Sequence, residues 1–144
     1  SDWGDLKDLI TQFVKRVHSL TKRGKDSVHW IWTAHVNEVT DSITQQLVST
    51  KIQLQGKNTA EVVMSIVDAI FYMYNKPIVI EEEGGKKRYE IERGILTRQV
   101  GPYVAGVRQS KRAEPLPAKI IDPVWSDIFE KLGYVRKDTL DNPV

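Results

Sequence analysis

The feature that most constrains the fold is a run of nearly all apolar residues, 28–34, with the sequence Val-His-Trp-Ile-Trp-Thr-Ala. Branched and aromatic side chains favour extended backbone. A strand that is apolar on both sides is typical of a parallel sheet that is covered by helices. We therefore expect Val28–Ala34 to form a buried strand of an α/β fold.

Residues 1–24, which precede this run, have the periodicity of an amphipathic helix. Apolar residues recur at three- and four-residue steps and would form one stripe: Leu6, Leu9, Ile10, Phe13, Val14, Val17 and Leu20. Asp2 can cap the start of this helix, and Gly24 follows its end. A helix, a short turn and a buried strand in this order fit a layered α/β architecture.

The rest of the chain divides into shorter elements. Asp122-Pro123 favours the start of a final helix, because proline is well suited to the first helical position. Trp125 and Ile128 would lie on the apolar face of this helix, and Gly133 would end it. The elements expected before it are a long loop over 36–58 with one short strand, a helix over 59–67, a strand over 69–74, a connection with a Gly84-Gly85 turn over 76–87, and a hairpin strand over 88–92.

The composition is that of an ordinary globular protein. The chain has 144 residues with 21 basic and 19 acidic side chains, a net charge of +2 that neither demands nor excludes nucleic acid. It has no cysteine, so disulfides and thiolate metal sites are excluded. No apolar run approaches the roughly 20 residues of a membrane span, and we expect a cytoplasmic protein. We expect residues 1–136 to form one folded part and residues 137–144 a flexible tail.

The phosphate-binding motif G-x-x-x-x-G-K-[ST] is absent from the sequence. Each Gly-Lys pair lacks the hydroxyl residue that must follow: Gly24-Lys25 precedes Asp26, Gly56-Lys57 precedes Asn58 and Gly85-Lys86 precedes Lys87. Since no other segment can cradle β- and γ-phosphates, we expect that this chain alone does not hydrolyse ATP.

Two positions have the chemistry of a nucleotide site. Thr33 and His35 close the expected strand, and polar side chains at the carboxyl end of a parallel strand point into the ligand crevice. Arg108 carries a planar guanidinium that suits a phosphoryl group. The alternatives are a strand-end histidine that hydrogen-bonds a loop, and a solvated basic loop around Arg108.

Taken in order, these segments resemble the C-terminal half of phage-encoded P-loop ATPases with a RecA-like core. Such proteins accompany phage single-strand annealing and recombination genes. The resemblance extends over roughly residues 1–132 and rests on these segments: Ser1–Gly4, Thr33–His35, Leu54–Lys57, Ile66–Tyr72, Lys87–Ile91, Tyr103–Arg108 and Leu116-Pro117.

The resemblance implies a partial RecA-like core, a mixed sheet with flanking helices, that lacks the N-terminal portion with the phosphate-binding loop. ATP and Mg²⁺ would bind to the complete protein and not to this chain alone. His35 matches a polar sensor position, with Thr33 beside the nucleotide. Arg108 matches an arginine that reaches a neighbouring subunit's nucleotide, although Gly106 and Ser110 depart from the residues usual around it.

Residues 36–57 fall where RecA-like proteins carry a mobile DNA-binding loop. Lys51 and Lys57 are its only lysines, and both are candidate contacts to nucleic acid. The resemblance thus implies an oligomeric ATPase of DNA recombination or repair. Its partners would be the missing N-terminal half or a neighbouring subunit, further copies of itself and single-stranded DNA, with no membrane.

Two other functions remain open. A stand-alone protein-interaction or regulatory module with a half RecA-like fold would be well packed, whereas an incomplete ATPase core would expose an edge or an apolar face of residues 28–34. A small nucleic-acid binder is the other alternative, and the net charge of +2 argues against it.

Overall fold

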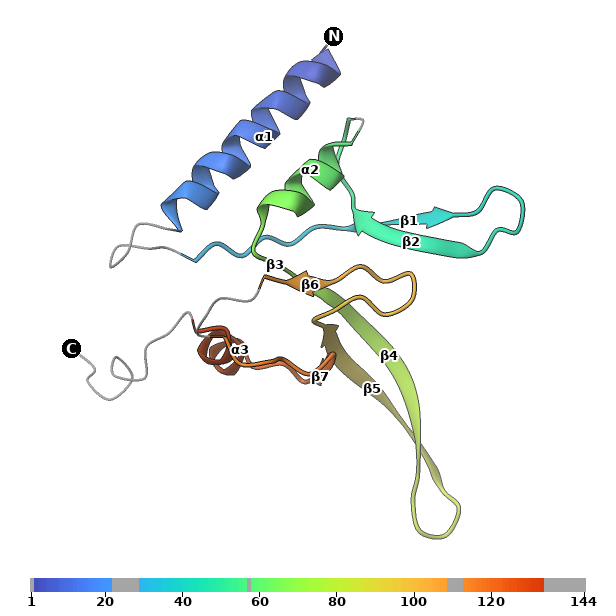
Figure 1. Cartoon of the computed structure of the whole chain (residues 1–144). Helices are drawn as coiled ribbons and strands as arrows, with labels where there is room; N and C mark the ends of the chain where they lie inside the picture. Colours follow the sequence, from blue (N-terminus) through green and yellow to red (C-terminus); the bar gives the residue numbers. More distant parts are fainter. Residues whose placement is uncertain (1, 22–28, 57, 109–112, 134–144) are drawn as a thin grey trace, which may run out of the picture. The chain divides into compact units, whose positions relative to one another are not determined.

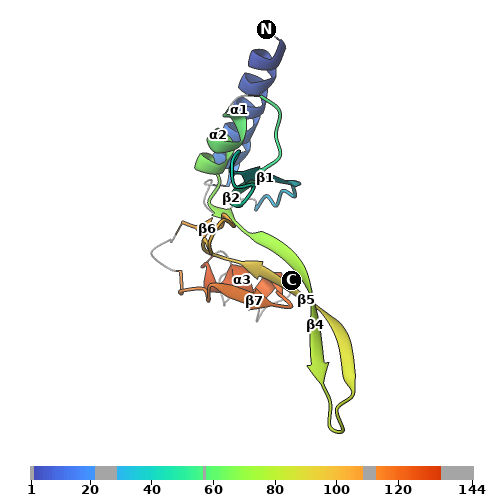
Figure 2. The ribbon, with the colours of Figure 1, turned by 90° about the vertical axis from the view of Figure 1, so that its right-hand side faces the viewer.

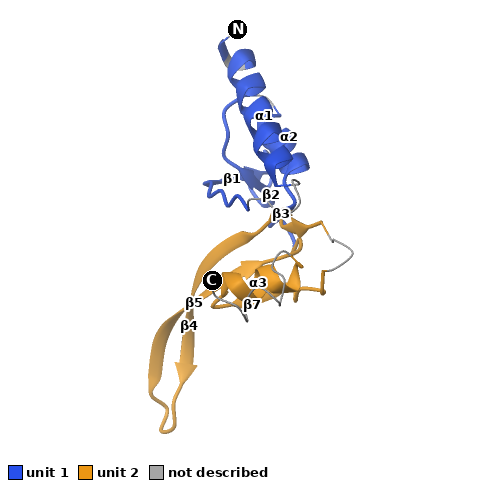
Figure 3. Cartoon of the chain, turned by 90° about the vertical axis from the view of Figure 1, so that its left-hand side faces the viewer, with its two compact units in different colours: residues 1–68, 101–103 blue, residues 69–100, 104–144 orange. Residues whose placement is uncertain are grey.

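A computed structural model describes residues 2–21, 29–56, 58–108 and 113–133. The described residues form a mixed α/β structure with three helices and small antiparallel sheets (Figure 1). The chain divides into two compact units, residues 1–68 with 101–103 and residues 69–100 with 104–144 (Figure 3). The part expected over residues 1–136 therefore contains two units, and the expected tail, 137–144, lies outside the described residues.

Two helices that pack against each other form the core of the first unit. The expected N-terminal helix is confirmed as α1 (Asp2–Leu20), and the helix expected over 59–67 is α2 (Thr59–Ile66). The helices lie side by side in both views (Figures 1 and 2) and bury Val14, Val17 and Val63. Full burial of one valine side chain contributes about 1.5–3 kcal/mol, so this apolar stripe is sufficient to hold the pair.

The segment expected as a long loop is a β-hairpin. Strand β1 (Val36–Thr40) pairs antiparallel with β2 (Leu47–Ile52). The one short strand expected within residues 36–58 is confirmed as β2, and the prediction of a loop is wrong for β1. Asp41 builds the turn, because its Oδ1 accepts from the backbone N–H of Ile43 and Thr44 at 2.9 and 2.7 Å. These hydrogen bonds, led by that from Thr44, lower the pKa of Asp41.

The buried strand expected over Val28–Ala34 is wrong for the described residues 29–34. These residues have no regular secondary structure, and the large side chains are exposed: Trp30 49%, Ile31 59% and Trp32 43%. No strand of the described part pairs with them, and extended backbone is stabilised only when a neighbour completes its ladder. An exposed apolar segment was the other part of the expectation, and it is confirmed.

The second unit is built on a long hairpin. Strand β4 (Tyr72–Glu81) pairs with β5 (Lys87–Leu96), and β7 (Lys119–Ile121) adds to β5 at Gly94–Leu96. A separate short pair joins β3 (Ala69–Ile70) to β6 (Gly106–Val107).

The expected return strand over 88–92 is confirmed as part of β5. The expected Gly84-Gly85 turn is also confirmed, with φ of 91° and 77°. The connection expected over 76–87 is wrong for residues 76–81, which are strand.

A short helix covers the base of this hairpin. Helix α3 (Trp125–Lys131) begins later than the sequence predicts, because Asp122 has a φ of 46° and the backbone becomes helical only after Val124. Ile128 and Leu132 bury themselves against Ile95 of β5, which is 0% exposed. Gly133 ends the helix, as expected, with a φ of 75°.

Residues 87–93 of β5 pair with β4 and not with β7. The two strands continue as a two-stranded arm, residues 75–93, that extends past the rest of the second unit (Figure 2). The exposed side chains of the arm include Val79, Tyr89 and Ile91. The sequence therefore builds one hairpin whose base lies in a core and whose far part faces solvent.

Candidate functional site

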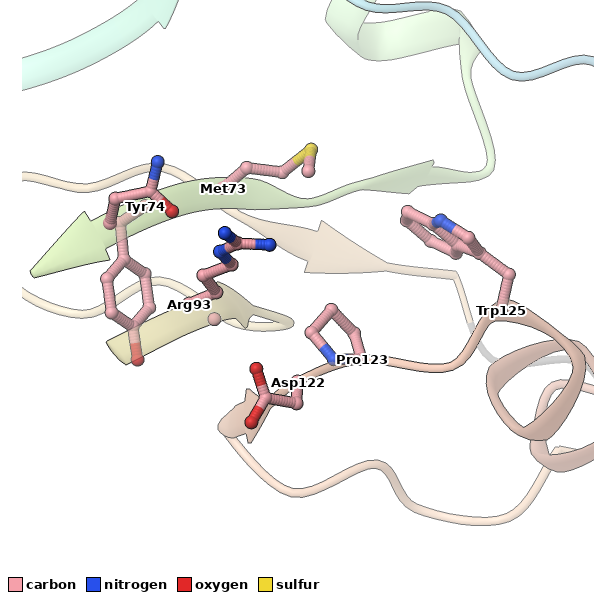
Figure 4. Close-up of a pocket in the computed structure, with 8 residues that line it drawn as sticks. Met73, Tyr74, Arg93, Asp122, Pro123 and Trp125 are labelled. Carbon is pink, nitrogen blue, oxygen red and sulfur yellow. The ribbon is translucent and has the colours of Figure 1, made fainter. Parts of the chain in front are cut away.

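A cleft of about 460 Å³ lies at the base of the arm, inside the second unit (Figure 4). Its lining combines one cation, one carboxylate, one amide and two aromatic rings with small or apolar neighbours: Met73, Tyr74, Asn75, Arg93, Gly94, Asp122, Pro123 and Trp125. Clefts with a few polar groups among apolar walls are the usual places where proteins bind ligands or partner side chains. We therefore treat this cleft as the candidate binding site of the second unit.

Three local features position the charged groups of the cleft. Arg93 lies on the same face of the hairpin as Met73, since their strand positions alternate with the buried and exposed sides. The backbone N–H of Asp122 donates to the carbonyl oxygen of Arg93 at 2.9 Å. The left-handed backbone of Asp122 then turns the chain through Pro123 toward Trp125, whose ring packs 5.7 Å from that of Phe71.

On the other face of the hairpin, an ion pair attaches β5 to β7. Lys119 Nζ lies 2.6 Å from Glu92 Oε1, and the Tyr74 hydroxyl donates to the same oxygen at 3.1 Å. The hydrogen bond from Lys119 lowers the pKa of Glu92, and the same bond raises the pKa of Lys119. Lys119 also lies 5.6 Å from the centre of the Tyr74 ring, within cation–π range.

Gly94 is required at the point where Tyr74 crosses the hairpin. The two residues are opposite each other in the register, and the Tyr74 ring covers the glycine. A Cβ at position 94 would overlap the ring, with Cε1 at 2.8 Å. The absence of a side chain thus lets the ring lie flat over the strand and reach Glu92.

The lining offers a guanidinium, a carboxylate and the indole of Trp125, groups that can bind a ligand or a partner side chain. The described residues do not gather three or more His, Asp or Glu side chains that could hold a metal ion. In the same described part, no helix is long and apolar enough to cross a membrane.

The structure places the predicted residues Thr33 and His35 in the first unit. Thr33 and His35 are exposed and lie in the segment without regular structure that leads into β1. The carbonyl oxygen of His35 accepts from the N–H of Gln53 at 2.8 Å, which fixes the backbone there. The parallel strand that would have aimed their side chains into a crevice is not formed by residues 29–34.

The predicted nucleic-acid contacts and the arginine are also dispersed. Lys51 lies in β2 and its Nζ is 2.8 Å from Glu61 Oε1 of α2, a hydrogen bond that lowers the pKa of Glu61. Lys57 lies outside the described residues. Arg108 follows β6 in the second unit, where it is exposed and interacts with a neighbour. The structure thus brings none of these side chains together within one unit's cleft.

The cleft residues were missed by sequence reasoning. Trp125 was assigned to the apolar face of its helix, which is confirmed, and Asp122 to a helix cap, which is wrong. The sequence holds no local signal of the cleft, because Arg93 and Asp122 come together only through the pairing of β5 with β7.

Comparison with known proteins gives no information on the function of this chain. No family model, no curated protein and no solved structure matches this chain. The function must therefore be argued from the exposed surfaces of the two units.

Proposed function

We propose that this chain is the C-terminal part of a phage RecA-like ATPase that acts in DNA recombination or repair. In the complete protein, ATP and Mg²⁺ would bind to a segment that carries the phosphate-binding loop. This chain would contribute one side of the core and would not hydrolyse ATP alone. The observation that carries the proposal is the uncovered apolar surface of the first unit, which we name the unit 1 surface: Leu9, Phe13, Trp30, Ile31 and Trp32.

The unit 1 surface adjoins the buried face of α1 and consists of apolar side chains of the kind that a protein core usually covers. Helix α1 buries Val14 and Val17 against α2, but Leu9 and Phe13 on the adjoining part of its apolar face are 64% and 58% exposed. The Phe13 ring lies 5.7 Å from that of Trp32. Exposed apolar side chains that contact one another, as Phe13 and Trp32 do, are typical of a binding surface.

The composition of residues 29–34 favours a strand that forms when a neighbouring strand is supplied. Such a strand would carry Thr33 and His35 to its carboxyl end, where they would lie beside the nucleotide. Lys51 and Lys57 would contact single-stranded DNA, and release of Lys51 from Glu61 would free a cation for a phosphate. Arg108 would reach the nucleotide of a neighbouring copy.

Isothermal calorimetry with Mg-ATP tests the proposal. We expect no binding heat from this chain at millimolar nucleotide, and binding after addition of the segment that precedes residue 1 in the complete protein. His35→Ala should leave assembly of the two parts unchanged and slow hydrolysis by the assembled protein. Micromolar binding of Mg-ATP by this chain alone would contradict the proposal, because it would require a phosphate cradle that we have not identified.

A stand-alone protein-interaction module is the second candidate. The arm is relevant to it, because a partner could contact the apolar side chains of this hydrogen-bonded hairpin, whereas the exposed residues 30–32 differ from the well-packed chain expected of such a module. Such a module would show no nucleotide dependence in any of its complexes. The same calorimetry distinguishes the two functions, since a module would give no binding heat with Mg-ATP even after the preceding segment is added.

A further inference from the structure

The cleft at the base of the arm holds charged and polar groups that no other side chain of the described structure engages. Arg93 and Asp122 are both exposed, and neither side chain makes a hydrogen bond or an ion pair within the described part of the chain. The same is true there of the amide of Asn75 and the indole N–H of Trp125. On the opposite face of the hairpin, by contrast, Glu92 has its partners. The cleft therefore keeps its hydrogen-bonding capacity for a ligand.

The apolar wall of the cleft suits an aromatic ring. Trp125 is half-buried, and its own ring packs 5.7 Å from that of Phe71 and 6.1 Å from that of Phe129, which holds it in place. Met73 extends from the hairpin toward the side on which Pro123 and Trp125 lie (Figure 4), and it is 61% exposed. Indole and thioether groups both make favourable contacts with aromatic rings. An aromatic ligand would thus meet a wall that is already ordered.

The charges of the cleft match a ligand that carries both signs. Arg93 is its one cation and Asp122 its one carboxylate, so the formal charges of the lining cancel. A phosphate would be attracted by Arg93 and repelled by Asp122, whereas a zwitterion gives each of them an opposite charge. The planar guanidinium suits a carboxylate through two parallel hydrogen bonds, and the carboxylate of Asp122 accepts from an ammonium. Asn75 lies opposite Arg93 in the register and adds an amide donor on the same face.

We infer that the cleft binds a free aromatic α-amino acid. Its carboxylate would lie on Arg93, its ammonium on Asp122 and its ring against Met73 and Trp125. The volume of about 460 Å³ lies within the range of about 300–1,000 Å³ that small-molecule sites occupy. The site lies within the second unit and is independent of the nucleotide function proposed above, so either proposal can fail without the other.

Two-dimensional NMR of the ¹⁵N-labelled chain, titrated with L-phenylalanine, tests the site. We expect the indole N–H resonance of Trp125, assigned with Trp125→Phe, to shift and to saturate with a dissociation constant of about 1 mM, because both charged groups of the cleft are exposed to water. The indole resonances of Trp30 and Trp32, which belong to the first unit, are internal controls that should stay in place. The absence of a saturable shift of the Trp125 resonance up to the solubility limit of the amino acid would overturn the inference.

Three analogues of phenylalanine test the chemistry of recognition. 3-Phenylpropanoate lacks the ammonium, 2-phenylethylamine lacks the carboxylate, and glycine lacks the ring. Each should bind at least about fivefold more weakly than phenylalanine, since each leaves one part of the cleft without its partner. An analogue that binds as tightly as phenylalanine would contradict the role assigned to the part of the cleft that faces the missing group.

Two near-isosteric variants test the two charges. Asparagine readily adopts left-handed backbone like that of Asp122, whose φ is 46°, so Asp122→Asn should keep the fold. It should weaken phenylalanine binding at least about fivefold, and binding of 3-phenylpropanoate should stay unchanged or become stronger. Arg93→Gln should weaken phenylalanine binding by a similar factor and leave 2-phenylethylamine unchanged or more tightly bound.

Lys87→Gln is the matched control for the arginine variant. It removes a cation from the same strand and the same face, at the far end of the arm, and it should change the dissociation constant of phenylalanine less than about twofold. If Asp122→Asn or Arg93→Gln weakens phenylalanine and both single-charge analogues equally, or weakens none of them, the assignment of the two charges is wrong.

Discussion

The arm and the segment 29–35 both expose large apolar side chains, but the backbone beneath them differs. The arm rests on an antiparallel ladder that runs from Tyr72 opposite Leu96 to Glu81 opposite Lys87. Residues 29–35 have no ladder in the described part of the chain. A partner that binds the arm meets side chains on a hydrogen-bonded backbone, whereas a strand that pairs with the segment would have to bring its irregular backbone into an extended form, at about 1–2 kcal/mol for each residue that must be fixed. Contact with the arm therefore carries no such conformational cost.

The base and the arm of the hairpin can be compared in the same way, by the effect of one substitution on the free energy of unfolding. Ile95→Ala and Ile91→Ala remove the same atoms from the same face of the same strand. At the base the change should cost about 2–5 kcal/mol, because it leaves a cavity beneath α3. In the arm of the monomer it should cost less than about 1 kcal/mol. Native-state hydrogen exchange at the amides of β5, measured in dilute protein, reports both values.

Equal losses of unfolding free energy for Ile95→Ala and Ile91→Ala would contradict the distinction between a covered base and an exposed arm. A cost at Ile91 as large as at Ile95 would mean that the arm is covered even in dilute protein. Measurements at several protein concentrations show whether the cover comes from the same chain, because only an intermolecular cover weakens on dilution.

The helices were predictable from the sequence because their pattern is local. The apolar spacing from Leu6 to Leu20 and the positions of Ile128 and Leu132 record one face of a helix without reference to the rest of the chain. The turn at Gly84-Gly85 was predictable for the same reason, since it depends on backbone conformations that glycine adopts without strain.

The strands were less predictable because extended backbone depends on its neighbours. The apolar residues 29–34 have every local preference of a strand and form none in the described structure. Pro77 and the glutamates 81–83 argued against a strand that the pairing with β5 stabilises. The cleft could not be predicted either, because Arg93 and Asp122 meet only through the pairing of β5 with β7.

A glycine pair tests how the hairpin is held where its base meets the arm. Gly94→Ala forces a Cβ into the Tyr74 ring and should cost about 1–3 kcal/mol. Gly106→Ala is the matched control, because a Cβ there meets nothing within 4 Å, and it should be neutral or slightly stabilising. Urea denaturation of each variant gives the free energy of unfolding. The cost of Gly94→Ala should shrink in a Tyr74→Ala background; an unchanged cost would place its origin in the backbone.

A buried hydroxyl tests the first unit in a similar way. Thr59 is 0% exposed, and its Oγ1 has no hydrogen-bond partner in the described part of the chain. Thr59→Val replaces this hydroxyl with a methyl group of similar shape, so it should be neutral or should stabilise α2 by up to about 1 kcal/mol. Thr59→Ala is the comparison that removes volume as well. Thermal denaturation should rank Val at or above Thr and Ala below it; a clear loss with Val would reveal a partner for the hydroxyl.

The smallest expected effect concerns the ion pair that fixes the start of the arm to β7. The Lys119 hydrogen bond lowers the pKa of Glu92 below its ordinary value of 4.5, so its contribution is present above that pH and is lost as the pH falls through the lowered pKa. Lys119, whose pKa is raised above 10.5, contributes fully below that pH and loses its contribution as the pH rises through the raised pKa. The difference in melting temperature between the natural chain and Glu92→Gln should therefore be constant near neutral pH and shrink in acid. A difference that stays the same down to pH about 2.5 would show that the contribution of Glu92 does not depend on its charge, and that hydrogen bonding rather than charge holds β7 on the hairpin.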